Sequence, residues 1–208
     1  SNPALCLTLE EWEERFAHWV RTPEPQALLN ATIFFDFRPL YGRFNLAHRM
    51  RLSLLRQTRG NPLFLRMLAQ NALSVSPPLG RIRDFVTGAD PGHPGTIDLK
   101  KYGVRLFTDA ARVFALAHQI EATNTVSRLK RASALMNFSS DDLAASLEGF
   151  NFIQLLRLRH QHFEQEHGRP GDNLIRPDEL NEIERRILKE AFRQARKLQA
   201  RLKLDYQL

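Results

Sequence analysis

The chain has 208 residues, 43% hydrophobic and 25% charged, with a net charge of +7, a composition typical of a globular protein with one good core or two small ones. No apolar run approaches the roughly 20 residues that span a bilayer, and the N-terminus lacks the pattern of a signal peptide, so we expect a cytoplasmic protein with no membrane partner. A single cysteine, Cys6, excludes an internal disulfide and a cysteine-based zinc site.

A helix and a short strand are the first predicted elements. Four apolar residues at helical spacing predict an amphipathic helix over 9–20: Leu9, Trp12, Phe16 and Trp19. Thr8, with Glu11 three residues later, marks its start as a capping box. The aromatic and β-branched run Ile33 to Phe37 predicts a buried strand that contains Asp36. A buried carboxylate needs a partner, so Asp36 is either a metal ligand or a structural ion-pair partner of Arg38.

The segment from Phe37 to Arg83 contains no Asp or Glu but nine arginines. They are Arg38, Arg43, Arg49, Arg51, Arg56, Arg59, Arg66, Arg81 and Arg83. Guanidinium groups suit bidentate contacts with phosphate or carboxylate. The segment therefore fits a nucleoside triphosphate, an acidic partner protein or a solvated basic face. Nucleic acid is the weakest candidate partner, because no groove-reading or base-stacking pattern accompanies the arginines.

Helices dominate the rest of the chain. The predicted ranges are about 46–57, 62–73, 104–119, from 124 onward, 139–167, and from between 177 and 181 to 202. Apolar residues surround more than one face of 139–167, so we expect this helix to be the most buried. Asn181, with Glu184 three residues later, marks a capping box at the start of the last helix. Regular apolar spacing along this helix predicts an antiparallel partner. The expected fold is a mostly α helical bundle with a short N-terminal helix-strand remnant.

Five short motifs follow one another along the chain. They are Ile33 to Arg38, Ile97 to Lys100 with Gly103, Asp109 to Arg112, Thr125-x-x-Arg128-Leu129, and Leu156 to Gln161. This order resembles a bacterial family of signal-transduction nucleotidyltransferases, similar to PII uridylyltransferase and glutamine synthetase adenylyltransferase. Full chains of that family carry cyclic-nucleotide-binding and CBS domains, a nucleotidyltransferase domain and a helical substrate-binding domain.

The resemblance implies a domain division and a set of site residues. Residues 1–44 would be the end of the catalytic domain, and 45–208 the helical substrate-binding domain. Asp36 would be a catalytic ligand of Mg²⁺. The residues implied to bind nucleoside triphosphate or acceptor substrate are Arg38, Lys100, Arg112 and Arg128. The implied partners are the nucleotide, an acceptor that is a protein or a small molecule, and the adjacent catalytic and regulatory domains.

Two functions stay open at this stage. The Gly-Ser turn and Asp-x-Asp pair of such enzymes are absent from this sequence, so the first expectation is a substrate-binding part that is inactive alone. The second is a regulatory helical module that docks an acidic partner without contacting nucleotide. An exposed edge of the predicted strand would also favour a homodimer.

Overall fold

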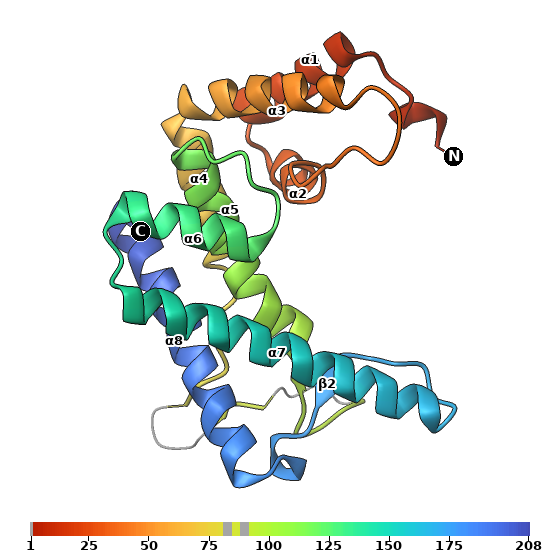
Figure 1. Cartoon of the computed structure of the whole chain (residues 1–208), viewed down its shortest axis with the longest axis vertical. Coiled ribbons are helices and arrows are strands. Elements are labelled where there is room, and N and C mark those ends of the chain that lie inside the picture. Colours follow the sequence, from red (N-terminus) through yellow and green to blue (C-terminus); the bar gives the residue numbers. More distant parts are fainter. Residues whose placement is uncertain (1, 81–84, 88–91) are drawn as a thin grey trace. The chain divides into compact units, whose positions relative to one another are not determined.

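The structure is a computed structural model that describes residues 2–80, 85–87 and 92–208; Arg81 and Arg83 thus lie outside the described residues. The helices are α1 Leu9–Arg21, α2 Pro25–Phe34, α3 Phe44–Arg59, α4 Pro62–Ala72, α5 Arg105–Ala117, α6 Thr125–Met136, α7 Ser140–Glu166 and α8 Glu182–Tyr206 (Figure 1). Short helical turns lie at η1 Pro3–Leu5, η2 Lys100–Val104 and η3 Pro177–Glu179. The two described strands, β1 Ile97–Asp98 and β2 Leu174–Ile175, pair antiparallel. The prediction of a mostly α fold is confirmed.

The segment predicted as a strand is the end of a helix and the turn that follows it, so the expected strand remnant is wrong. Ile33 and Phe34 end α2, and the chain turns at Phe35 and Asp36. The buried residues recur at helical spacing: Ala27, Leu28, Ala31 and Phe35. Ile33, by contrast, is 61% exposed. Burial of this helical stripe overrides the β-propensity of the individual residues, and a dimer through a strand edge loses its basis.

The chain forms two compact units. Unit 1 comprises residues 1–71 and 111–136. Its core is rich in aromatic rings, with Phe16 and Phe35 at 5.1 Å and Phe35 and Phe64 at 6.0 Å between centroids. α1 begins at the predicted capping box, in which Thr8 and Glu11 satisfy each other's backbone amides. The domain boundary near residue 44 stays a prediction.

Unit 2 comprises residues 72–110 and 137–208, with α7 packed along α8. A close approach of the two helices occurs at Gly149, where an added Cβ would lie 3.0 Å from Cα of Ala191. The predicted capping box of Asn181 and Glu184 starts α8. Pairing of β1 with β2 joins Ile97 to Ile175. No helix in the described part of the chain combines the length and apolar character needed to cross a bilayer.

The prediction that the helix 139–167 is the most buried is wrong. α7 leaves Leu155, Leu158 and Phe163 between 51% and 63% exposed. α5 is the more buried helix, with eight hydrophobic residues in the core: Leu106, Phe107, Ala110, Ala111, Val113, Phe114, Ala115 and Leu116. Its residues contribute to both units. Apolar residues spread around α7 cannot all meet a neighbouring helix, so part of them stays in solvent.

Candidate functional site

Asp36 lies in the turn after α2, where two arginines from distant helices hold its carboxylate. Nη2 of Arg112 in α5 lies 2.8 Å from Oδ2, and Nη2 of Arg128 in α6 lies 2.6 Å from Oδ1. The side chains of Arg112 and Arg128 are 6% and 2% exposed, and that of Asp36 is 27% exposed. Solvent therefore reaches part of the Asp36 side chain, although its Oδ1 atom is buried, whereas the side chains of both arginines are buried.

A third arginine, Arg51 of α3, binds the backbone on either side of Asp36. Its guanidinium donates to the carbonyl oxygen of Phe35 and, at 2.7 Å, to that of Phe37. The same group lies 4.1 Å from the centroid of the Phe37 ring. Carbonyl groups at the end of a helix carry partial negative charge, so Arg51 both caps α2 and fixes the turn that presents Asp36.

This arginine cluster, consisting of Arg51, Arg112 and Arg128 around Asp36, has a local excess of positive charge. Burial alone raises the pKa of Asp36, but the guanidinium groups of Arg112 and Arg128 bring it below its usual range. Burial, and to a lesser extent repulsion from Arg128, lowers the pKa of Arg51 to about 10. Burial also lowers the pKa of Arg128, against the opposing attraction of Asp36. Arg112 and Arg128 therefore share the carboxylate of Asp36, and Arg51, which Glu121 also attracts, adds a third positive charge beside them.

The structure brings together some of the residues implied by sequence. Asp36, Arg112 and Arg128 meet in unit 1. Arg38 is exposed, and the carboxylate beside it is held by the other two arginines. Lys100 is an exposed residue of unit 2, outside the unit that contains the arginine cluster.

Sequence reasoning missed Arg51 as a separate member of the site. Arg51 is 5% exposed and lies on the buried face of α3. Leu54, Leu55 and Thr58 follow it at intervals of three, four and seven residues and are also buried. This helical spacing was the available signal, because an arginine on an apolar helix face needs a buried partner.

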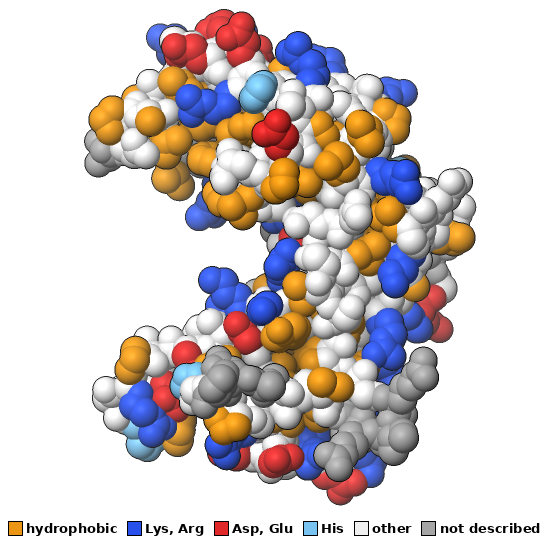
Figure 2. Space-filling model, turned by 180° about the vertical axis from the view of Figure 1, so that it is seen from behind, with side chains coloured by type: hydrophobic (Ala, Val, Ile, Leu, Met, Phe, Trp, Pro, Cys, Tyr) orange, Lys and Arg blue, Asp and Glu red, His pale blue; other side chains and the backbone are white. Residues whose placement is uncertain are grey.

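An exposed surface follows the arginine cluster in the chain. Residues 38–46 are all exposed, with Leu40, Tyr41 and Phe44 at 83%, 98% and 58%. We call these nine residues, of which the last three begin α3, the apolar-basic loop, because they also include Arg38 and Arg43. Hydrophobic and basic side chains lie interspersed on the molecular surface in Figure 2. Exposed aromatic and aliphatic side chains of this kind are typical of interaction sites.

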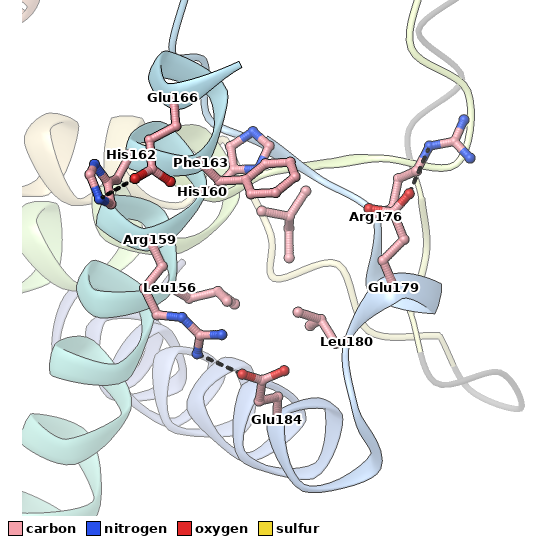
Figure 3. Close-up of a pocket in the computed structure, with 11 residues that line it drawn as sticks. Leu156, Arg159, His160, His162, Phe163, Glu166, Arg176, Glu179, Leu180 and Glu184 are labelled. Carbon is pink, nitrogen blue, oxygen red and sulfur yellow. Dashed lines mark hydrogen bonds and ion pairs between the residues drawn. The ribbon is translucent and has the colours of Figure 1, made fainter.

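Unit 2 contains a pocket of about 440 Å³ lined by residues from α7, η3 and the start of α8 (Figure 3). Its charged residues pair with one another. Arg159 lies 2.6 Å from Glu184, and His162 lies 3.4 Å from Glu166. Phe163 contributes apolar surface. This pocket includes residues of the last sequence motif, but its positive charge is already balanced by acids in its own wall.

Comparison with known proteins identifies one family. The family model described as "Putative nucleotidyltransferase substrate binding domain" matches residues 62–206. These residues include α4 to α8, and with them Arg112 and Arg128 of the arginine cluster. Neither the curated proteins nor the solved structures include a significant match to the chain.

Proposed function

The chain belongs to the family of nucleotidyltransferase substrate-binding domains, and from this premise we propose that it binds the acceptor of a nucleotidyl transfer performed by a catalytic domain of the full-length protein. The acceptor is a protein, as in PII uridylyltransferase, or a small molecule. The nucleoside triphosphate binds between the two parts, and the chain alone transfers no nucleotide. Cyclic-nucleotide-binding and CBS domains of the same protein regulate the reaction.

The observation that carries this proposal is the arginine cluster. Nucleotidyl transfer develops negative charge on a triphosphate, and buried guanidinium groups stabilise such charge in a water-poor site. Arg112 and Arg128 are held in place by burial and by Asp36, so an incoming phosphate would take the position of that carboxylate against donors that already converge there. Asp36 holds the pair in place in the absence of ligand, and its 27% exposure leaves part of its side chain accessible.

Mg²⁺, which this chemistry normally uses, does not fit the surroundings of Asp36. Both oxygens of this carboxylate contact guanidinium groups, and a divalent cation beside three arginines would be repelled. In the residues that the structure describes, no group of three His, Cys, Asp or Glu side chains could hold a metal ion. The metal-ligand role of Asp36 stays a prediction for the full-length protein, and it would require this carboxylate to leave Arg112 and Arg128.

Two measurements test the proposal. The first compares labelling from a radioactive nucleoside triphosphate by the full-length protein and by this chain alone; metal-dependent transfer by the isolated chain would refute the division of roles. The second measures the melting temperature of the chain with UTP or ATP at low and high salt. A ligand that binds the native state raises the melting temperature, and salt should reduce the shift.

Variants of the arginines and of Asp36 test whether the melting-temperature shift arises at the arginine cluster. Arg112→Ala should remove the triphosphate-dependent shift, whereas Arg66→Ala should retain it, because Arg66 is an exposed arginine of the same acid-free segment. Loss of folding is separated from loss of binding by circular dichroism without ligand. In the folded Asp36→Ala chain the two arginines lose their internal anion, so its triphosphate-dependent shift should exceed that of the unmodified chain. Equal shifts in all four proteins would reject the arginine cluster as the binding site.

One observation favours a second function. The apolar-basic loop exposes Leu40 at 83% and Tyr41 at 98% beside the exposed, basic Arg38 and Arg43, which suits a regulatory module that docks an acidic protein. Arg38→Glu with Arg43→Glu would abolish such docking to the catalytic domain supplied as a separate chain, without changing the triphosphate-dependent shift. Unchanged association after this double charge reversal would reject the docking function.

A further inference from the structure

A second pocket in unit 2, of about 480 Å³, lies beside the rare helical turn that precedes α5. Its described lining residues are Ser74, Val75, Ser76, Pro77, Pro78, Val86, Thr96, Ile97, Lys101 and Tyr102. The volume falls in the range of about 300–1,000 Å³ typical of small-molecule sites. η2 is a π-helical turn, a conformation that recurs at functional sites. We call this cavity the η2 pocket.

The chemistry of the η2 pocket differs from that of the pocket in Figure 3. Its described lining has one cation, Lys101, and no Asp or Glu. Four hydroxyl groups and a strip of apolar side chains complete this lining. The Nζ atom of Lys101 lies 4.9 Å from the centroid of the Tyr102 ring. A cation with hydroxyl donors and no lining acid favours an anionic ligand.

Surrounding contacts hold the walls of the η2 pocket in position. Oδ1 of Asp98 accepts hydrogen bonds from the backbone amides of Lys100 and Lys101 at 2.8 and 2.9 Å, which fixes the start of η2. At another lining residue, the buried Gln199 donates to the carbonyl oxygen of Val75 at 2.7 Å. Pairing of β1 with β2 fixes Ile97. These contacts hold Lys101, Ile97 and Val75 in position before a ligand binds, which reduces the entropy lost on binding at this part of the lining.

We propose that the η2 pocket binds a phosphate monoester of nucleotide size. The three terminal oxygens of a phosphomonoester match one ammonium group and several hydroxyl donors better than the two oxygens of a carboxylate do. The ammonium of Lys101 and the hydroxyl of Ser76 contact the phosphate, and the ring of the ligand packs on Pro77 and Val86. This site is separate from the arginine cluster and exists whether or not the chain takes part in nucleotidyl transfer.

Isothermal titration of the whole chain with UMP and AMP tests the proposal, with uridine and inorganic phosphate as probes of each half of the ligand. We expect at least one monophosphate to bind, and the neutral nucleoside and free phosphate each to bind at least tenfold more weakly. Lys101→Gln should weaken binding at least tenfold. Lys100→Gln is the matched control, because Lys100 carries the same charge in the same turn but does not line the pocket.

Each other outcome counts against the site. Equal weakening by Lys100→Gln and Lys101→Gln would show a general charge effect. Loss of binding in Arg112→Ala, with normal binding in Lys101→Gln, would assign the ligand to the arginine cluster. Absence of binding by either monophosphate at millimolar concentration would reject the proposal even if the full-length protein transfers nucleotide. Ser76→Ala provides a second variant in case Lys101→Gln does not fold.

Discussion

Replacement of Asp36 by alanine should strongly destabilise unit 1. The substitution leaves Arg112 and Arg128 buried, at 6% and 2% side-chain exposure, without their shared carboxylate. Breaking a buried ion pair by removing one partner costs about 3–5 kcal/mol. Because Asp36 itself is 27% exposed and water can reach the vacated position, we expect the lower end, about 3 kcal/mol.

The assay is urea unfolding, with a matched surface pair as control. Asp205 is also 27% exposed, but it pairs at 2.7 Å with Arg201 one turn earlier on α8. Asp205→Ala should therefore cost only about 0.5 kcal/mol. In a chain of this length, a loss of about 3 kcal/mol corresponds to a melting temperature lower by roughly 6–12 °C. Hydrogen exchange should place the loss of protection in unit 1 for Asp36→Ala.

A loss below about 1 kcal/mol for Asp36→Ala, or a loss equal to that of Asp205→Ala, would refute the reasoning, since a buried pair would then behave like a surface pair. Sulfate gives a further check on the folded variant. If the freed guanidinium groups attract anions, sulfate should restore more stability to Asp36→Ala than to Asp205→Ala at equal ionic strength.

Three further predictions concern acid stability and helix packing. The pKa of Asp36 is held below its usual value. Its contribution to the unfolding free energy is therefore present above about pH 4 and is lost as the pH falls through the folded-state pKa. In urea titrations, the unfolding free energy of Asp36→Asn should therefore fall less on acidification than that of the unmodified chain. Gly149→Val should cost about 2 kcal/mol, because the new side chain would overlap Ala191, and an unchanged urea midpoint would contradict this packing. Asn181→Ala removes a cap that accepts from the amide of Glu184 at 2.9 Å and should cost about 1 kcal/mol, as measured by the same unfolding assay.

Helix boundaries were predictable where a local signal exists. The capping residues Thr8 and Asn181 predicted the starts of α1 and α8, because a cap depends only on residues within one turn. The strand prediction at Ile33 to Phe37 failed, because it relied on residue type and passed over spacing. Positions 27, 28, 31 and 35 carry the buried stripe, and a period of three to four indicates a helix.

Partner choice at the site could be predicted only in part. Arg112 and Arg128 were predicted as site residues from the order of the motifs, because no local rule pairs Asp36 with an arginine 76 residues away. For Arg51 the sequence contained a more specific indication of burial than its charge alone. A cation on the apolar face of α3, in a segment without acids, can be buried only against backbone carbonyls or a distant carboxylate. Arg51 binds the carbonyls of Phe35 and Phe37 beside Asp36, so burial pattern and local charge together constrain the partner more tightly than either does alone.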